Sequence, residues 1–221
     1  MSKCDSLGGM SLNQVNCSFI PHVTCADDHI SRTYDIFSRL LRDRGIILSG
    51  PIDDNLADLI IAQLLHLAAE NASLPINMYI NSPGGSVTSG LAIYDAIRYV
   101  ACPVHTIIIG QACSAATIIS ISGEWRAKTQ YARMMLHQAS GGVSGQAADM
   151  RRAVAEMNEL SAIIEEIYLR HAKIPKDKLR EVLDRDTYVR GDTAIEWGLV
   201  DEIIESRKSS HSKDSEVDLH V

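Results

Sequence analysis

A serine, a histidine and several late carboxylates are the residues of this sequence that could together cleave an acyl bond. Ser114 follows an apolar run and opens a stretch of small residues, beginning with Ala115 and Ala116. The positive end of a helix there would favour anionic species, and small neighbours leave room for a peptide carbonyl. The same position suits an ordinary helix-capping serine, and the segment lacks the G-x-S-x-G pattern of a nucleophile elbow. Ser114 is therefore a candidate nucleophile, whereas Cys113 beside it is interpreted as a buried structural thiol.

His137 is the histidine whose position best suits proton transfer. It directly follows the apolar run Met134–Leu136 and precedes a loop that contains Gly141 and Gly142. An imidazole titrates near neutral pH, so it can take a proton from a serine and return it to a leaving amine. A buried structural histidine is the alternative interpretation. The other seven histidines lie near the chain ends, within predicted helices or at the start of a strand: His22, His29, His66, His105, His171, His211 and His220.

A serine–histidine pair also needs a carboxylate that holds the imidazole tautomer and stabilises its cation. Asp184, Asp186 and Asp192 are the candidates, since all three lie near a late predicted strand. Asp186 directly precedes that strand, where a helix gives way to it. Asp184 and Arg185 could instead make charge contacts with a neighbour, and local physics leaves the choice open.

The segment Asn81–Ser86 could supply an oxyanion hole. Gly84 and Gly85 follow a proline, and adjacent glycines leave backbone N–H groups exposed and let another chain approach closely. Such N–H groups can stabilise a developing negative oxygen. A simple turn before a helix is the commoner use of this pattern.

The elements that must position these residues alternate between short apolar runs and helical periodicity, which predicts an α/β fold with mainly parallel strands. A flexible, irregular start is expected to about residue 29. We expect helices at about 34–44, 54–74, 86–100, 146–173, 176–185 and around 194, a further helix of small residues that begins at about 114, and strands at 46–48, 76–80, 105–109, 134–136, 187–189 and 199–204.

Bulk properties exclude several classes of protein. The chain has 221 residues and a formal net charge of −7, which argues against a nucleic-acid-binding protein, because phosphate binding draws on a basic surface. Five cysteines without a CxxC pair predict neither a disulfide framework nor structural zinc and favour a reducing compartment. No metal cluster or phosphate-binding loop is evident. No apolar run approaches the roughly 20 residues of a membrane span, and no secretory signal is evident.

Several segments, taken in order, resemble the ClpP family, the proteolytic subunit of Clp protease. The resemblance runs from about Phe19 to Ile204 with nearly continuous spacing. The segments that carry it are Tyr34–Leu41, Tyr79–Val87, Gly110–Ser114, Met135–Gln138, Gly141–Gly142, Gly145–Ala147, Asp184–Asp186 and Glu196–Asp201.

This resemblance implies a ClpP/crotonase-like α/β fold of repeated β-β-α units with a protruding handle helix. It implies Ser114 as nucleophile, His137 as general base and acid, and Asp186 as the orienting carboxylate. The oxyanion hole would use the N–H groups of Gly84 and Ala115, with Gly85 shaping it. The assembly residues that link ring contacts to triad alignment would be Asp184 and Arg185.

The resemblance further implies a serine endopeptidase that needs no cofactor and works inside two stacked seven-membered rings, homo- or hetero-oligomeric. An AAA+ unfoldase of the Clp type would supply unfolded protein substrates, and neither nucleic acid nor membrane is expected as a partner. We expect residues 1–18 to be a flexible leader or propeptide, 19–205 the peptidase domain and 206–221 a disordered tail. A bacterial cytoplasm is the expected location, with an organelle of bacterial origin as the alternative.

Departures from the family pattern indicate a divergent paralogue or a member of a mixed ring. Ala115 and Ala116 replace the usual Met-Gly after the serine, and Ala139 replaces a proline after the His-Gln pair. Two alternatives to an active peptidase are a regulatory or structural ring subunit and a crotonase-like acyl-CoA enzyme. The crotonase-like enzymes use backbone N–H groups but need no Ser–His–Asp set.

Overall fold

The computed structural model describes residues 20–27 and 30–204. The expected leader and tail lie outside these residues. The chain divides into two compact units, Met1–Arg39 and Leu40–Val221, which are described separately. No helix among the described residues is long and apolar enough to cross a membrane.

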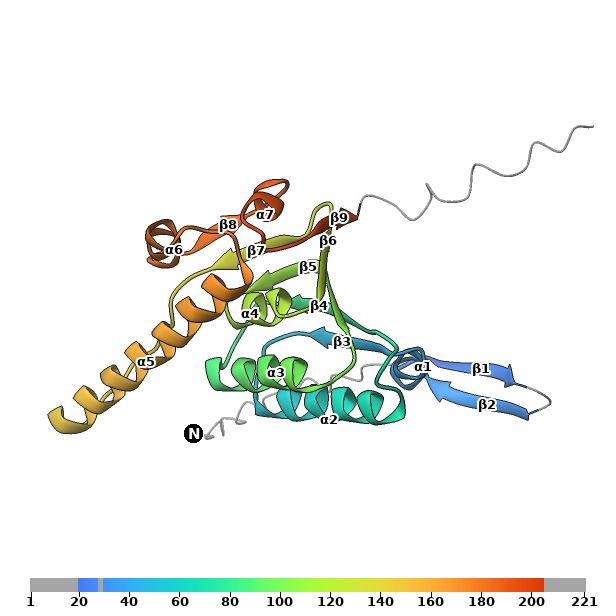
Figure 1. Cartoon of the computed structure of the whole chain (residues 1–221). Helices are drawn as coiled ribbons and strands as arrows, with labels where there is room; N and C mark the ends of the chain where they lie inside the picture. The colour runs from blue at the N-terminus through green and yellow to red at the C-terminus, as the bar shows by residue number, and fades with distance from the viewer. Residues whose placement is uncertain (1–19, 28–29, 205–221) are drawn as a thin grey trace, which may run out of the picture. The chain divides into compact units, whose positions relative to one another are not determined.

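The elements alternate between strands and helices along most of the chain (Figure 1). The strands are β1 His22–Asp27, β2 Ile30–Asp35, β3 Gly45–Ser49, β4 Ile76–Ser82, β5 Val104–Cys113, β6 Trp125–Thr129, β7 Arg133–Leu136, β8 Thr187–Val189 and β9 Glu202–Ile204. The helices are α1 Ile36–Arg42, α2 Asp54–Glu70, α3 Val87–Tyr99, α4 Ala115–Ile121, α5 Ala147–His171, α6 Lys176–Leu183 and α7 Thr193–Glu196.

The first unit contains an antiparallel hairpin of β1 and β2, in which His22 pairs with Asp35. The expected irregular start to residue 29 is therefore wrong from His22 onward, and the expected helix start at Tyr34 is also wrong. The reason is local. The Asp35 carboxylate accepts hydrogen bonds from the N–H groups of Phe37 and Ser38, both at 3.0 Å, so the helix begins after Asp35. A hydrogen bond from the Ser38 hydroxyl first, and then these two N–H bonds, lower the pKa of Asp35.

The second unit is built on a seven-stranded sheet, mostly parallel, with the strand order β3-β4-β5-β6-β9. The strand β5 has two partners on the same side. His105–Ile108 pair with β6, while Gln111–Cys113 pair with β7. The α/β architecture predicted from the sequence is thereby confirmed. The carboxyl ends of the parallel strands β4, β5 and β7 meet at one edge of the sheet, where ligand sites of α/β folds collect.

Several strand boundaries differ from those expected. β5 continues through Gly110 to Cys113 instead of ending at Ile109, because its second half finds a new partner in β7. β6 was not expected at all, since its sequence Trp-Arg-Ala-Lys-Thr lacks an apolar run. Its two buried residues are Ala127 and Lys128. The Nζ of Lys128 donates hydrogen bonds to the Thr129 and Gln130 carbonyls. Burial lowers the pKa of Lys128.

The core lies between the sheet and helices α2, α3 and α4. Fully buried side chains of the strands, such as Ile46 and Ile80, pack in one cluster with Ile60 and Leu64 of α2 and with Ile93 of α3. Aliphatic burial of this kind stabilises the fold by roughly 1.5–3 kcal/mol per side chain. The helices therefore hold the sheet rigid beneath the edge where β4, β5 and β7 end.

The long helix α5 extends away from the sheet, as Figure 1 shows. Its buried residues are Ile164, Ile167 and Tyr168, all in the last third of its 25 residues. The earlier part buries no side chain against the described chain. This agrees with the protruding helix expected from the sequence.

The end of α5 is anchored by His171. Its Nε2 lies 2.9 Å from the Tyr94 hydroxyl of α3. Burial first, and then the positive charges of Arg98, Arg126 and Arg170, lowers the pKa of His171 to about 4. In an unfolded chain the same imidazole titrates near 6.5. The folded protein therefore stabilises the neutral form of the His171 imidazole.

This depressed pKa predicts that stability is lost as the pH falls. Between about pH 6.5 and 4 the unfolded chain binds a proton at His171 that the folded chain does not bind. The contribution of neutral His171 to the free energy of unfolding is therefore complete above this pH window and is lost as the pH falls through it. Allowing for solvent screening, we expect wild type to lose about 1–2 kcal/mol more than His171→Gln between pH 7 and 4. Urea unfolding at several pH values measures this.

The matched control is His66→Gln, which alters a histidine of α2 whose side chain is 60% exposed. This variant should follow the wild-type pH dependence. If His171→Gln also follows it, His171 does not contribute to the acid sensitivity.

Candidate active site

The site lies where β5 ends and α4 begins. Ser114 occupies this junction with φ 56° and ψ −125°, a region that a side-chain-bearing residue rarely adopts. Such backbone strain costs on the order of 1–3 kcal/mol and persists only where the surroundings fix it. Here the Ser114 N–H donates to the Met135 carbonyl at 2.8 Å, and the Ser114 carbonyl accepts from the Thr117 N–H at 2.9 Å. The sharp turn raises the Ser114 side chain above the strand end.

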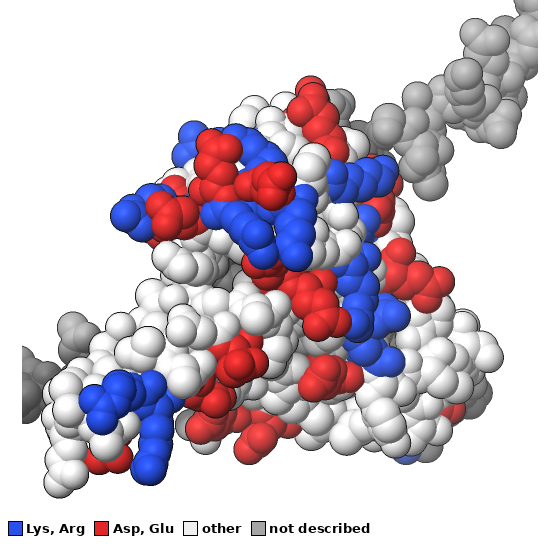
Figure 2. Space-filling model, turned by 60° about the vertical axis from the view of Figure 1, so that its left-hand side comes forward, with Lys and Arg blue, Asp and Glu red and all other residues white. Residues whose placement is uncertain are grey.

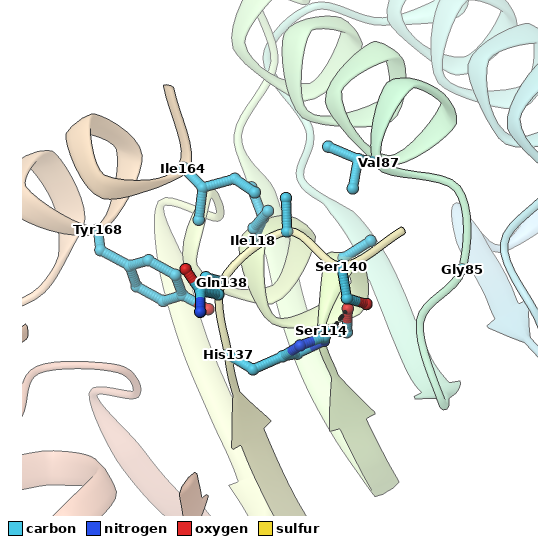
Figure 3. Close-up of a pocket in the computed structure, with 11 residues that line it drawn as sticks. Gly85, Val87, Ser114, Ile118, His137, Gln138, Ser140, Ile164 and Tyr168 are labelled. Carbon is cyan, nitrogen blue, oxygen red and sulfur yellow. Dashed lines mark hydrogen bonds between the residues drawn. The ribbon is translucent and has the colours of Figure 1, made fainter. Parts of the chain in front are cut away.

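His137 faces Ser114 from the end of the neighbouring strand. Because Cys113 pairs with Met135 across β5 and β7, the residues that follow the two strands are brought side by side. His137 Nε2 lies 2.7 Å from Ser114 Oγ, and Figure 3 shows this hydrogen bond. The structure therefore brings together the two residues that the sequence singled out for nucleophilic chemistry.

Asp186 lies on the other side of the imidazole. Its Oδ1 is 4.0 Å from His137 Nδ1, within ion-pair range but too long for a hydrogen bond. The Asp186 side chain is 62% exposed. It is placed by the pairing of Thr187 with Leu136 in β8 and β7.

The two other carboxylates have different neighbours. Asp184 forms a 3.3 Å ion pair with Arg185, and both side chains are mostly exposed. Asp192 directly precedes α7 and faces the buried Lys128. Of the three candidate carboxylates, Asp186 is thus the one that contacts His137.

The segment Asp184–Arg185 is connected to the site through the backbone. The Gln138 N–H, next to His137, donates to the Leu183 carbonyl at 2.8 Å, directly before Asp184. On the face drawn in Figure 2, basic and acidic side chains lie next to one another around this part of the molecule. Nearby pairs include Arg180–Glu165 and Lys178–Glu181.

The two glycines approach the Ser114 turn and the backbone of Ile52 so closely that no side chain fits. A Cβ on Gly84 (φ 90°) would overlap the Cys113 carbonyl and lie 2.7 Å from Ser114 Cβ. A Cβ on Gly85 would overlap the backbone of Ile52, with which Gly85 forms a bridge. The Gly84 N–H donates to the Ser82 hydroxyl at 3.1 Å. Among the hydrogen bonds of the described residues, none uses the N–H of Gly85, and Ala115 begins α4, where the first N–H groups have no partner within the helix.

A pocket opens beside Ser114 and His137. Its walls combine polar and apolar groups, with Tyr168 of α5 at one side, as Figure 3 shows. The other lining residues are Gly85, Val87, Ala115, Ile118, Gln138, Ala139, Ser140 and Ile164. Among the described residues, no group of three or more His, Cys, Asp or Glu side chains could hold a metal ion.

Two polar residues of the site, Thr117 and Tyr168, were not predicted from the sequence. Thr117 lies one helical turn after Ser114 and is fully buried, and Tyr168 is 1% exposed. The available signal for Thr117 was a hydroxyl three residues after the serine in an otherwise mainly apolar helix. Tyr168 gave no local signal, because its approach depends on how α5 packs.

The arrangement is that of an α/β protein with a serine–histidine pair at the carboxyl edge of its sheet. The model of the Clp protease family matches residues 28–207. Since this match covers most of the 221 residues, the chain belongs to the Clp protease family and is a ClpP-like peptidase. The resemblance noted in the sequence is thereby confirmed.

The close approach of Gly84 predicts that Gly84→Ala displaces the Ser114 turn. A displacement of about 1 Å in a reacting group can cost 10²-fold in rate, so we expect the reaction of Ser114 with a fluorophosphonate to slow at least about tenfold. The time course of labelling measures this.

Gly142→Ala is the matched control, because a Cβ on Gly142 would meet no described atom within 4 Å. It should label at the wild-type rate. Equal rates for both glycine variants would contradict the proposed fit between Gly84 and the Ser114 turn.

Proposed function

We propose that this chain is the serine endopeptidase core of a compartmentalised, ATP-dependent protease that cuts unfolded proteins into short peptides. The observation that carries the proposal is the 2.7 Å contact between His137 Nε2 and Ser114 Oγ in a chain of the Clp protease family. A peptidase of this family that holds a serine against an imidazole has the two groups that acyl transfer requires.

The chemistry would proceed in two stages. His137 accepts the proton of the Ser114 hydroxyl while Ser114 Oγ attacks the scissile carbonyl, and the imidazolium then protonates the leaving amine. This breaks the C–N bond and leaves an acyl ester on Ser114. A water molecule then attacks the ester while His137 accepts its proton. The bond between the acyl carbon and Ser114 Oγ breaks, the imidazolium returns the proton to Oγ, and the second fragment leaves as a carboxylic acid.

Asp186 would hold the imidazole so that Nε2 faces the serine. A carboxylate in this role normally accepts a hydrogen bond from Nδ1. The 4.0 Å between Asp186 Oδ1 and His137 Nδ1 is too long for this hydrogen bond. In the proposed mechanism the contact tightens when Asp184 and Arg185, which directly precede Asp186, engage a neighbouring subunit.

The oxyanion hole would use the N–H groups of Gly85 and Ala115. The sequence predicted Gly84 as the donor, with Gly85 in a shaping role. The Gly84 N–H is engaged by Ser82, however, and that of Gly85 is available. Gly84 then contributes close packing against Ser114, and two backbone donors remain to stabilise the tetrahedral oxyanion.

The pocket beside Ser114 would bind the substrate side chain on the acyl side of the cut bond. Val87, Ile118 and Ile164 give it an apolar wall, and the small Ala115 leaves space next to the nucleophile. Apolar side chains are therefore the proposed preference.

We further propose assembly into two stacked seven-membered rings, with α5 at the contact between rings. ClpP-type proteins generally form such rings and work with Clp ATPases, and the exposed outer part of α5 supports the same use here. An AAA+ unfoldase would deliver the unfolded substrates. A bacterial cytoplasm is the proposed location.

The peptidase proposal predicts covalent labelling of Ser114 by a fluorophosphonate. Labelling should disappear in Ser114→Ala, because the nucleophilic oxygen is removed, and should persist in Ser86→Ala, which removes a helix-capping serine of α3. Intact-protein mass spectrometry measures the adduct. An assembled wild-type protein without an adduct would favour a regulatory or structural ring subunit, for which the open 4.0 Å contact is the supporting feature.

The assembly proposal predicts a tetradecamer when the chain is expressed alone and analysed by native mass spectrometry. Charge reversal in Arg185→Glu should shift the population toward single rings and smaller species. A monomer or single ring for wild type would instead indicate that a second type of subunit completes the particle.

A further inference from the structure

A buried threonine joins the two strands that carry Ser114 and His137. The Thr117 hydroxyl lies 3.1 Å from the Ala112 carbonyl of β5 and 3.0 Å from the Met135 carbonyl of β7. Its side chain is fully buried. One hydroxyl proton is therefore shared between two strand ends.

Both carbonyls belong to the backbone that determines the distance between the reacting groups. Ala112 is two residues before Ser114, and Met135 is two residues before His137. The Met135 carbonyl also accepts the Ser114 N–H at 2.8 Å. Thr117 thus acts on the same acceptor that holds the strained turn of the serine.

Tyr168 completes this arrangement from α5. Its buried phenol lies close enough to the Thr117 side chain to influence the pKa of Tyr168. Burial raises the pKa of Tyr168, so the phenol stays protonated at neutral pH. Since the single Thr117 proton is directed at the carbonyls, a hydrogen bond between the two side chains would have the Tyr168 O–H as donor and the Thr117 oxygen as acceptor. Figure 3 shows Tyr168 reaching from α5 to the site.

We propose that Thr117 is a positioning residue for the Ser114–His137 pair and that Tyr168 anchors it. The proposal rests on the proposed peptidase function. The Ser114 turn is strained and needs surroundings that fix it. The carboxylate of Asp186 makes no hydrogen bond to His137, so the placement of the imidazole depends more heavily on the backbone of β7.

The contrasting interpretation is a threonine that satisfies buried carbonyls and stabilises the fold. In that case, substitution of Thr117 would lower thermal stability without a selective effect on turnover. Thr106 provides the comparison. It is also a buried threonine, and its hydroxyl donates to the Ser120 carbonyl at 2.6 Å, at the end of α4 away from Ser114.

The test compares Thr117→Val, Thr117→Ser and Thr106→Val in the full-length chain at matched assembly state. Two rates are measured, namely fluorophosphonate labelling of Ser114 and cleavage of a fluorogenic peptide with an apolar residue before the cut bond. We expect Thr117→Val to lower the labelling rate and kcat at least about tenfold with KM within about twofold, because bound substrate is unaffected while the attacking atoms are displaced. Thr117→Ser should restore most of the rate, and Thr106→Val should retain it.

Tyr168→Phe tests the anchor, since it removes the phenol oxygen and keeps the ring in the pocket wall. We expect a smaller fall in kcat, about two- to fivefold, again without a matching rise in KM. If Thr117→Val does not fold, Thr117→Ser is compared with Tyr168→Phe. Thr117→Ser keeps the hydroxyl at position 117 and should keep most of the rate, whereas Tyr168→Phe removes the proposed bond to that hydroxyl and should lower kcat.

The outcomes separate this inference from the proposed function. A wild-type chain that does not label overturns the peptidase proposal and this inference with it. A wild type that labels, with Thr117→Val and Thr106→Val equally active, overturns the positioning role alone. A rise in KM with unchanged kcat would also overturn it, by assigning Thr117 to substrate binding.

Discussion

The hydrogen bond from the Ser114 N–H to the Met135 carbonyl is the contact on which the site depends. It ties the end of β5 to the end of β7 at the point where each strand delivers a side chain. Together with the bond from the Thr117 N–H to the Ser114 carbonyl, it holds Ser114 at φ 56°. The pairing of Cys113 with Met135 fixes the register, and the register in turn determines that His137 reaches Ser114. The rest of the second unit can be understood as the support that keeps this register rigid.

The divided pairing of β5 explains how the sheet creates room for a site. Its first half is covered by β6 and its second half by β7, so the two partner strands separate along β5. The carboxyl ends of β4 and β7 then lie on either side of Cys113 and Ser114. Glycines on the β4 side allow close packing of backbone against the serine turn, while β7 supplies the imidazole. Backbone geometry thus does most of the positioning, and few charged groups are required.

The sequence predicted the α/β architecture and the approximate places of most strands, because these depend on local apolar runs and on the alternation of strands with helices. The pairing of Ser114 with His137 was implied by the family resemblance, since local patterns left both residues with structural alternatives. The sequence did not predict β6, whose strand character arises from neighbours on both sides rather than from its own residues. It also missed the hairpin of β1 and β2, since polar strands carry no clear period. Among site residues, the proposal of Gly85 rather than Gly84 as oxyanion donor required knowing that Ser82 engages the Gly84 N–H. Tyr168 was missed because only tertiary packing brings α5 to the nucleophile.

The unequal burial of α5 has a thermodynamic consequence. At 1.5 Å per residue a 25-residue helix is about 40 Å long. Within the described part of the chain, only its last turns bury apolar side chains. Most helical stability in proteins comes from such contacts rather than from intrinsic propensity. The outer turns therefore gain their order from whatever surface covers them, and amide hydrogen exchange should be slow near Tyr168 and progressively faster toward Ala147. Where a second protein surface covers those turns, their amides exchange more slowly, so the exchange rates along α5 report which turns are covered.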